Sequence, residues 1–594
     1  METRYKKYID EYTAKQKILH RKSALVGLLK FVLLIILAAL VYNMVAQRTS
    51  LQKLILAGTT LVLSVPLWIY HSRISSAISK YDELKEIVKN YIQRIQGEWT
   101  VFTGKGEEYI DYQHPYTFDL DIFGGKSLYQ YINSAGTAQG REQLRKDLSS
   151  PGYSLSEISD RQNATKELAC ENNDKFCFEL QYLSRQTKES EKIDKLVKTL
   201  EERKPLFKTP WMQNIFKILP AVTLSMFIIS ADSSYRLSLA VPLGLTCLQI
   251  LLWVCLSFKT NKYLSNIRDG KNALDEYSSL FTCISKNSFN SKLLAEIQNQ
   301  IGDNFAGKAI KQLDGIVQRI SFRENIILNI SLNALLLWDI NCCISLEKWK
   351  TSFGSKINIW LKLSGDVESL ISLAVLNRTL TKFSYPKLTE GSAHSFKAVN
   401  LGHPLISNDS RIYNDFQMVN NMNVISGSNM SGKTTFLRTI GINSILAKTG
   451  AVVCADSLVL SNMQVMTSMR IVDDLQEGVS TFYAELNKIK TIVDSTEENS
   501  NILFLIDEIF RGTNSQDRTE GARAVMEKLS QNGAAGFLTT HDLKLCENTS
   551  RIKIQNYHFS ELYESGKLIF NYILKTGIAK TTNGRYLMQM LGLI

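Results

Sequence analysis

Hydrophobic residues follow three different patterns along this chain. Two long apolar runs lie near the N-terminus, a second pair lies in the middle, and short apolar runs alternate with amphipathic stretches in the C-terminal third. Apolar runs of about 20 residues are typical of membrane-crossing helices, whereas short runs that end in polar or turn residues are typical of buried parallel strands. The pattern predicts an α/β domain at the C-terminus, preceded by an all-α region with transmembrane helical hairpins.

The first pair of apolar runs predicts a transmembrane hairpin. Residues 24–46 are apolar apart from Lys30 and Asn43, and residues 54–70 end in the aromatic pair Trp68 and Tyr70. A run of the first length spans the roughly 30 Å hydrocarbon core, and aromatic rings favour the membrane interface. A cleavable signal peptide is the alternative for the first run, but no small-residue cleavage site precedes the second run.

A second transmembrane hairpin is predicted at residues 215–231 and 237–258. Basic residues gather outside both hairpins, whereas the turns between the runs hold few. Because positive charge stays on the cytosolic side, this distribution predicts a multi-pass protein of the inner or plasma membrane with both termini in the cytosol. The apolar stretch 326–337 is interrupted by asparagines, and we expect it to be a buried core helix.

Composition narrows the function classes only a little. The formal charge of +12 is compatible with nucleic acid or an anionic membrane surface, but part of it lies in the first 22 residues, beside an apolar run. The nine cysteines are scattered without C-x-x-C pairs or nearby histidine clusters. This spacing argues against a disulfide framework and against a zinc site.

A phosphate-binding loop is the clearest chemical motif. The segment from Asn423 to Thr435 reads as a strand running into G-x-x-x-x-G-K-T, and a helical pattern follows. In such a loop the backbone N–H groups surround phosphates, the lysine reaches the outer phosphates and the hydroxyl binds Mg²⁺. We therefore predict an ATP and Mg²⁺ site whose residues are Gly427, Ser428, Asn429, Met430, Ser431, Gly432, Lys433, Thr434 and Thr435.

Two further strands are predicted to complete this site. The apolar run 501–506 ends in Asp507 and Glu508, and the run 536–540 ends in His541. Asp507 is predicted to bind the metal together with Thr434, and Glu508 to polarise the attacking water, because phosphoryl transfer depends on positioning and charge neutralisation. His541 is predicted to sense the γ-phosphate. With Lys433 these are the predicted catalytic residues.

The order of motifs resembles the ATPase domain of the MutS (DNA mismatch repair) family. The matching segments are GSNMSGKTTFLRTIG, LAKTGAVVCA, DDLQEGVSTFYAEL, DEIFRGTNSQDR, TTHDLKL and GRYLMQMLG. The resemblance implies that Ser480 and Thr481 contact the γ-phosphate of a partner subunit, and so implies a homodimer. It also implies that residues 514–517 lie at the dimer interface and that Tyr572 stacks on adenine. His403 and Pro404 match the start of the domain.

The sequence departs from the family pattern at four positions of these motifs. Ser428 stands in place of a proline, Thr434 of a serine, and Phe510 and Arg518 of glycines. None of these changes removes a catalytic group, but Phe510, beside Glu508, is expected to alter the rate.

Fainter resemblance extends upstream to the core and lever domain of the same family. It rests on residues 119–133, 137–141, 148–151 and 360–376. We therefore divide the chain into 1–100 (basic segment, first hairpin and linker helix), 101–395 (helical core and lever with the second hairpin) and 396–594 (ATPase domain). The family's mismatch-reading domain, with its Phe-x-Glu wedge, has no counterpart, because Phe322–Glu324 and Phe559–Glu561 fit only by coincidence.

The leading hypothesis is a dimeric, membrane-anchored MutS-like ATPase facing the cytosol. Its DNA ligand, double-stranded or branched, is implied by resemblance only, with Lys308, Lys311 and Arg319 as candidate phosphate contacts. One alternative is an ATP-driven membrane scaffold or defence module without DNA, with protein partners that the sequence does not name. Another is an ABC-type transporter, which the missing Leu-Ser-Gly-Gly-Gln motif and the few spans disfavour.

Overall fold

The computed structural model describes residues 2–46, 51–187, 190–201, 206–207, 209–231, 238–268, 271–302, 305–390, 394–418, 421–428, 431–470, 481–510, 514–564 and 567–579. Internal contacts divide the chain into two compact units. Unit 1 holds Met1–Ile132, Pro151–Ile158 and Leu373–Ile594, and unit 2 holds Asn133–Ser150 and Ser159–Ser372. Both units therefore combine segments that are distant in the sequence.

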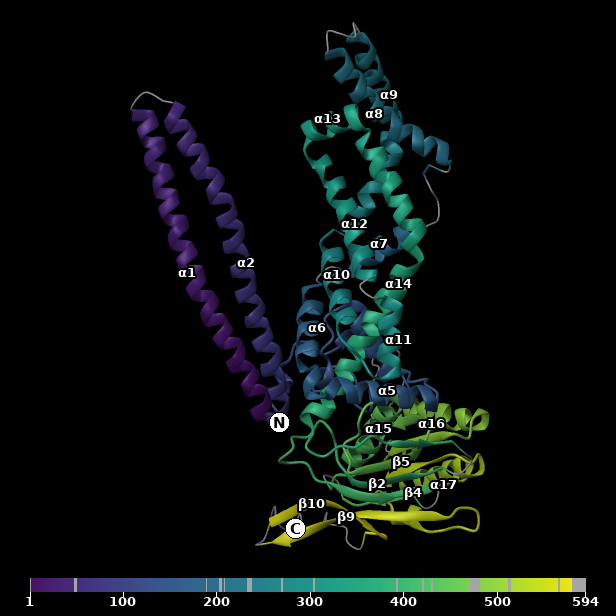
Figure 1. Cartoon of the computed structure of the whole chain (residues 1–594). Coiled ribbons are helices and arrows are strands. Elements are labelled where there is room, and N and C mark those ends of the chain that lie inside the picture. Colours follow the sequence, from purple (N-terminus) through teal and green to yellow (C-terminus); the bar gives the residue numbers. More distant parts are fainter. Residues whose placement is uncertain are drawn as a thin grey trace. The chain divides into compact units, whose positions relative to one another are not determined.

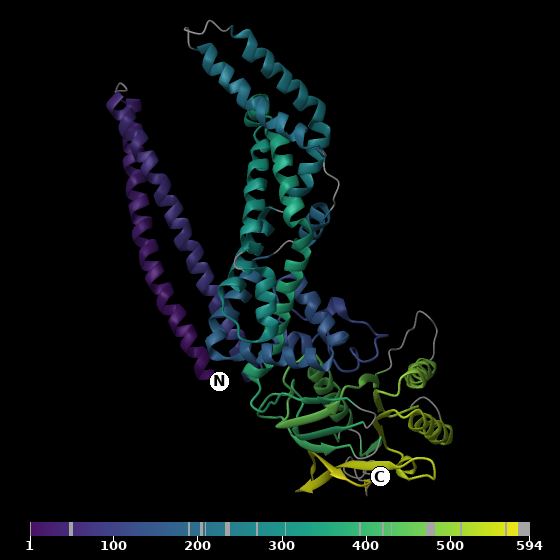
Figure 2. The same cartoon turned by 45° about the vertical axis from the view of Figure 1, so that its right-hand side comes forward.

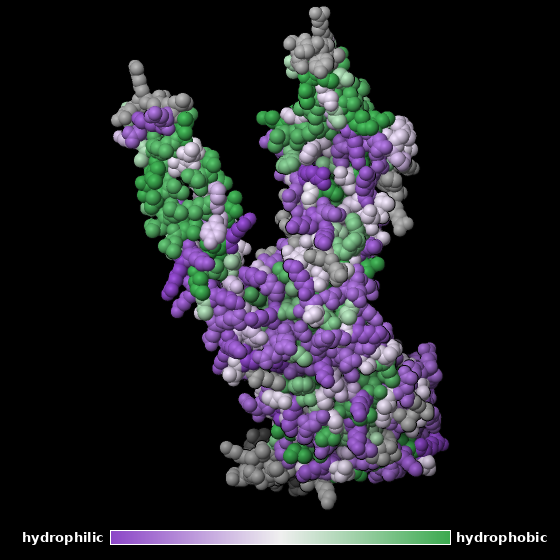
Figure 3. Space-filling view, viewed as in Figure 1, coloured by the Kyte–Doolittle hydropathy of each residue, from purple (hydrophilic) through white to green (hydrophobic). Residues whose placement is uncertain are grey.

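Two long helices open unit 1, α1 (Glu2–Ala46) and α2 (Leu51–Gln96), which pack along each other in antiparallel fashion (Figure 1). The polar half of α1 lies against the end of α2, where Tyr5 stacks on Tyr91 with ring centroids 5.3 Å apart. The apolar halves lie side by side but stay exposed, with 0% and 6% of their most hydrophobic windows buried. Figure 3 shows this apolar surface over the far halves of both helices.

Unit 2 is entirely helical in its described part. It contains α4 (Ala138–Ser149), most of α5 (Leu155–Ala169), α6 (Asp174–Gln186), α7 (Ser190–Glu201), α8 (Pro210–Ala231), α9 (Ala240–Arg268), α10 (Lys271–Lys286), α11 (Lys292–Ile301), α12 (Phe305–Ser321), α13 (Ile326–Leu336) and α14 (Trp338–Thr379) up to Ser372. Amphipathic helices such as α12 bury one apolar face, which includes Leu313 and Val317. This agrees with the all-α region that the sequence predicts.

Helices α8 and α9 contain the second pair of apolar runs and pack against each other, as the turned view of Figure 2 also shows. One polar pair lies between them: the side-chain amide of Gln249 donates a 2.6 Å hydrogen bond to the buried Thr223 hydroxyl. By length and composition, α1, α2, α8 and α9 are each capable of crossing a membrane. The four predicted apolar runs thus fall on four long helices.

Helix α13 differs from the prediction. We expected residues 326–337 to form a buried core helix, but Ile326 and Ile327 are 75% and 76% exposed. Asn333, by contrast, is fully buried. The expectation was wrong because it inferred burial from the apolar run and its interrupting asparagines, whereas the helix buries Asn333 and leaves its aliphatic side chains exposed.

Unit 2 also contains one very close helix crossing, between α4 and α14. A Cβ atom on Gly140 would lie 2.8 Å from Cβ and Oε2 of Glu368. That buried carboxylate accepts the backbone N–H of Gly136 at 2.8 Å and the Thr137 hydroxyl at 2.5 Å. Since Thr137 is also the N-cap of α4, Glu368 fixes where this helix begins.

The C-terminal part of unit 1 is an α/β domain with two sheets. The larger sheet has the order β10-β9-β4-β8-β7-β6, parallel except for β10, and the smaller has the order β1-β5-β2-β3. The strands are β1 (Lys387–Thr389), β2 (Phe396–Leu401), β3 (Asn414–Gln417), β4 (Met422–Ser426), β5 (Ser457–Ser461), β6 (Gln464–Ser468), β7 (Ile502–Asp507), β8 (Ala535–Thr540), β9 (Ile554–Glu564) and β10 (Lys567–Thr576). Besides the hairpin and the ends of α5 and α14, the described α-helices of unit 1 are α3 (Leu128–Ile132), α15 (Lys433–Thr449), α16 (Thr481–Glu498) and α17 (Ser515–Gln531).

The central strands β4, β7 and β8 are buried along their whole length. This is expected of parallel strands covered by helices on both faces. An apolar cluster between the sheet and α16 and α17 includes Ile492, Phe504 and Met526. The predicted α/β ATPase domain preceded by a helical region is thus confirmed at the level of fold class.

The close crossing in unit 2 yields a prediction. Gly140→Ala should lower the stability of the full chain by about 1–3 kcal/mol, because the added methyl group must displace Glu368. The matched control is Gly315→Ala in α12, where nothing lies within 4 Å of the new Cβ and a helix-interior alanine should be neutral or stabilising. Urea unfolding followed by far-UV circular dichroism measures both. Equal midpoints for the two variants would contradict the crossing.

Candidate functional site

The site begins with the register of three parallel strands. Ser426 at the end of β4 pairs with Thr540 of β8, and Asp507 at the end of β7 pairs with Thr539 of β8. Parallel strands in this register bring their carboxyl ends to one edge of the sheet, where ligands of α/β folds bind. The three strand ends that the sequence predicted to meet therefore do meet.

The phosphate-binding loop connects β4 to α15. Gly427 and Gly432 have φ values of 152° and 106°, and Gly432 in particular adopts a backbone conformation that favours glycine. Lys433 is 4% exposed in its side chain, and its ammonium donates to the carbonyls of Gly427 and Ser428 at 2.8 and 2.9 Å. Asn429 and Met430, also predicted for this loop, lie outside the described residues.

An oxygen cluster lies beside the loop, at the end of β7. The Thr434 hydroxyl donates to one carboxylate oxygen of Asp507 at 2.7 Å, and the Thr539 hydroxyl donates to the other. Within the described ranges, no group of three or more His, Cys, Asp or Glu side chains could hold a metal alone. Mg²⁺ needs no such group, because one or two protein oxygens suffice when phosphates and water complete its shell. Thr434 and Asp507 therefore fit this ion.

Glu508 lies between the loop and β8. One of its carboxylate oxygens is 2.6 Å from Nε2 of His541 and 3.6 Å from the Lys433 ammonium. Such a short distance requires Nε2–H of His541 to donate to the carboxylate, so the 3.3 Å approach of Lys433 to the same nitrogen is only a close contact. Lys433, Glu508 and His541, the three predicted catalytic side chains, thus form one cluster.

The backbone of Glu508 is held in an uncommon conformation. Its φ is 49°, in the left-handed region, and its N–H donates to the carbonyl and hydroxyl of Thr539 at 3.2 and 3.1 Å. Left-handed conformations of non-glycine residues cost about 1–3 kcal/mol and gather at functional sites. This turn directs the carboxylate toward Lys433 and His541 rather than along the strand.

A cavity of about 410 Å³ opens beside the loop, and its lining includes Lys433, Thr434, Glu508 and Tyr572. The Tyr572 ring packs against Gly432, where a Cβ atom would come within 3.0 Å of it. Tyr572 lies at a bulge between β9 and β10, and Asn414 bonds its carbonyl at 3.1 Å and the Leu574 N–H at 2.7 Å. The ring predicted to stack on adenine therefore lines the cavity next to the phosphate loop.

His403 lines the same cavity from the segment after β2. Burial, reinforced by the nearby Arg438 and Arg411 guanidinium groups, lowers the pKa of its imidazole to about 3. Its Nδ1 accepts the Leu405 N–H at 3.3 Å. His403 is therefore neutral at physiological pH.

The predicted contacts across a dimer interface are only partly described. Ser480 lies outside the described residues, and Thr481 is the first residue of α16. Asn514 accepts the Asp517 N–H at 2.9 Å and so caps α17. Residues 514 and 517 are thus placed by helix capping at the start of α17.

Phe510 combines two unusual properties. Its φ is 61°, and yet its ring is buried, 6.1 Å from the Phe482 ring centroid. A Cβ atom on Gly521 would lie 3.0 Å from this ring. The resemblance places glycine at position 510, which suits the backbone, and the phenylalanine instead fills space between α16 and α17.

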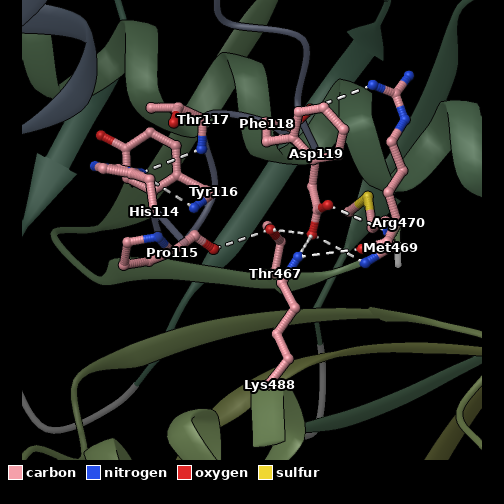
Figure 4. A network of polar contacts seen from close by, with 10 residues as sticks. All are labelled: His114, Pro115, Tyr116, Thr117, Phe118, Asp119, Thr467, Met469, Arg470 and Lys488. Carbon is pink, nitrogen blue, oxygen red and sulfur yellow. Dashed lines mark hydrogen bonds and ion pairs between the residues drawn. The ribbon is translucent and has the colours of Figure 1, made fainter. Parts of the chain in front are cut away.

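An unpredicted carboxylate, Asp119, ties the segment before α3 to the ATPase domain (Figure 4). Asp119 is 1% exposed. It accepts hydrogen bonds from the Thr467 hydroxyl at 2.8 Å, from the N–H groups of Met469 and Arg470 at 3.0 and 3.1 Å, and from the Lys488 ammonium at 2.7 Å. Asp119 thus joins the end of β6 to α16, and Ser480 lies between these two elements in the sequence.

The neighbouring Asp121 extends this network to the phosphate loop helix. Its carboxylate receives both terminal nitrogens of Arg470, at 2.6 and 2.9 Å, and Nη1 of Arg438 at 2.9 Å. Arg438 lies on α15, five residues after Lys433. The segment 114–121 therefore contacts both the helix that begins at the phosphate loop and the strand beside β7.

Sequence reasoning assigned residues 119–133 to the start of the core domain and gave Asp119 no role. Thr539 and Asn414 were also missed. Two threonines at the end of an apolar strand were the only available signal for Thr539. The sequence holds no comparable signal for Asn414 or Asp119, because their partners are distant in the chain.

Comparison with known proteins agrees with this geometry. Residues 423–593 match MutS domain V. DNA mismatch repair protein MutS of Bacillus cytotoxicus is 33% identical over 248 residues, 40% of this chain and 27% of that protein. The MutS proteins of Pseudothermotoga lettingae and Thermotoga petrophila are each 31% identical, over 41% and 43% of this chain and 30% and 31% of their own lengths.

The chain thus spans about 30% of the length of the curated relatives it matches. Its C-terminal domain is an ATPase domain of the MutS domain V type, a kind of domain that uses ATP and Mg²⁺. The resemblance stated from the motifs is confirmed for this domain.

The Asp119 network yields a prediction for the full chain. Asp119→Asn should destabilise the protein by about 3–5 kcal/mol, because an uncharged amide leaves the Lys488 ammonium in a partly buried place without its counterion. Thermal unfolding followed by intrinsic fluorescence should show a lower midpoint. Asp409→Asn, on an exposed loop position, is the control and should leave the midpoint unchanged. Equal midpoints for the two variants would show that Asp119 does not stabilise the contact between the segment before α3 and the ATPase domain.

Proposed function

We propose that this protein is a membrane-anchored, MutS-like ATPase that works as a homodimer and couples ATP turnover to DNA. The observation that carries the proposal is the cluster of Lys433, Glu508 and His541 beside the Thr434–Asp507 oxygen pair, all at the edge of one parallel sheet. The rest of the proposal is supported by separate features of the helices and of unit 2.

The roles of the site residues follow from this cluster. Bound Mg²⁺, held by Thr434 and Asp507, would neutralise charge on the phosphates. Lys433 would reach the outer phosphates once they replace the loop carbonyls as its acceptors. Glu508 would accept a proton from the attacking water, and His541, which donates to Glu508, would hold that carboxylate in place. Tyr572 would stack on the adenine ring.

A homodimer is supported by the resemblance and by the position of the candidate interface residues. In the family pattern, Ser480 and Thr481 complete the site of the partner subunit. The Asp119 network anchors the two elements that flank residues 471–480, β6 and α16. Both described elements next to Ser480 in the sequence are thus held by one carboxylate, which supports a role for Ser480 and Thr481 at a defined interface.

Membrane anchoring is supported by four helices of sufficient length and apolar character. The apolar part of α1 extends about 35 Å, which matches the hydrocarbon core. Its single lysine, Lys30, lies 3.8 Å from the centre of the Trp68 ring, a pairing suited to the membrane interface. With an even number of spans and basic flanks, the ATPase domain and both termini would face the cytosol.

Binding of a polyanion is supported by a basic hollow in unit 2. The hollow is lined by Lys175, Lys286, Lys308 and Lys311, with Glu179 as the one acidic group. These lysines come from α6, α10 and α12 and all are exposed. Lys308 and Lys311 were predicted from the sequence as phosphate contacts. Double-stranded or branched DNA is the polyanion that the resemblance to MutS favours.

The first test is the ATPase rate of the detergent-solubilised full chain with and without homoduplex, mismatched and branched DNA. Glu508→Gln should lower hydrolysis roughly 10²–10⁴-fold by removing the general base. Glu498→Gln, at the exposed end of α16, is the matched control and should keep the wild-type rate. DNA should stimulate the wild type. A Glu508-dependent rate that no DNA changes would instead favour the scaffold function.

The second test addresses the basic hollow. Replacing Lys308 and Lys311 by glutamine should weaken DNA binding and reduce the salt dependence of log K by up to about one unit per lost phosphate contact. Fluorescence anisotropy over a range of salt concentrations measures both quantities. Lys362→Gln, an exposed lysine of α14, is the control. An unchanged salt slope in the double variant would place DNA elsewhere.

A further inference from the structure

Helix α13 has the reverse of the polarity expected at a water-exposed surface. Its exposed side chains are Ile326, Ile327, Leu328, Ile330 and Leu335, together with Ser331. Its inward side carries the buried Asn333, whose amide donates to the carbonyl and side chain of Asn329 at 3.0 and 2.7 Å. A helix that turns amides inward and aliphatic groups outward is suited to an apolar medium.

Polar contacts hold both ends of α13 to α9. Arg323, just before the helix, bonds the Asn261 side chain and forms an ion pair with Asp339 at 3.0 Å. Asp339, just after the helix, is buried and accepts the indole N–H of Trp253 at 3.2 Å. Its own N–H donates to Asn333 at 2.9 Å. The chain then turns by 77° into α14 at Leu337, whose φ is 47°.

These attachments fix the level of α13 along α9. Trp253 lies before the end of the apolar run at Phe258, and Asn261 lies after it. The two attachment points are about 12 Å apart along the helix axis, and they lie on either side of that end. A tryptophan at such a position is typical of the boundary between acyl chains and headgroups.

We propose that α13 is an interfacial helix, whose exposed aliphatic face lies in the boundary layer of the same bilayer that α8 and α9 cross. This inference rests on the membrane anchoring proposed above. At 11 residues the helix extends about 16 Å, too short to span the membrane but suited to lying along its surface. The exposed Lys259 and Arg319 on the neighbouring helices α9 and α12 suit anionic headgroups at this level.

A bilayer fits this face better than a protein partner does. The apolar face of α13 is continuous with the apolar surface of α8 and α9, which pack against it. In Figure 3 the hydrophobic surface covers this end of unit 2. A second copy of the chain would instead need a complementary apolar surface that covers α13. The experiment below distinguishes contact with a second copy from contact with lipid.

Photocrosslinking of the full chain tests the inference. Benzoylphenylalanine is placed singly at Ile327 of α13, at Leu251 on the exposed side of α9, or at Lys308 on α12. Each variant is reconstituted into vesicles of phosphatidylcholine and phosphatidylglycerol that contain an alkyne-tagged lipid, and is then irradiated. All three positions are exposed, so the substitutions are compatible with folding.

Lipid adducts are expected at Leu251 and Ile327, both on the order of tenfold above those at Lys308, because only the first two contact acyl chains. Adducts at Leu251 without adducts at Ile327 would overturn the interfacial role of α13 and leave the membrane anchoring intact. A dominant crosslink from Ile327 to a second copy of the chain would also overturn it. Absence of lipid adducts at Leu251 would overturn the membrane anchoring itself.

Discussion

The nucleotide site depends on one carboxylate, that of Asp507. Its two oxygens accept hydroxyl groups from Thr434, at the start of the phosphate-loop helix, and from Thr539, on the adjacent strand. Since Glu508 follows directly and bonds the same Thr539 through its backbone N–H, the position of the Lys433, Glu508 and His541 cluster follows from that of Asp507. The hydroxyls of Thr434 and Thr539 therefore both position Asp507, in addition to the metal-binding role proposed for Thr434.

Much of this site could be predicted from the sequence because its chemistry is local. Asp507, Glu508 and His541 lie at the ends of apolar strands, and Lys433 and Thr434 follow another such strand through the phosphate-binding loop. A parallel sheet gathers these strand ends at one edge. The family resemblance added Tyr572, whose ring the structure places against Gly432. What local pattern could not supply was the support of these groups, because Asn414 is 158 residues from the carbonyl that it holds.

Two other features, the contacts of Asp119 and the orientation of α13, could not be predicted from the periodicity of apolar residues. Asp119 precedes its partners Thr467 and Lys488 by about 350 residues, so no nearby pattern marks it as part of the ATPase domain. Helix α13 has an apolar composition that predicts burial in any apolar environment, and composition alone does not say whether that environment is protein or lipid. Only the inward orientation of Asn333 separates the two, and orientation is a property of the fold.

Phe510 and Gly521 show how a departure from a family pattern is accommodated. The left-handed backbone at 510 favours glycine, whereas the space between α16 and α17 favours a large ring. The phenylalanine fills that space but keeps a backbone conformation that is unfavourable for a residue with a side chain. The ring crowds position 521, where a Cβ atom would lie 3.0 Å from it. The two positions are therefore sterically coupled: glycine at 510 would remove the ring beside position 521 and make room there for a side chain.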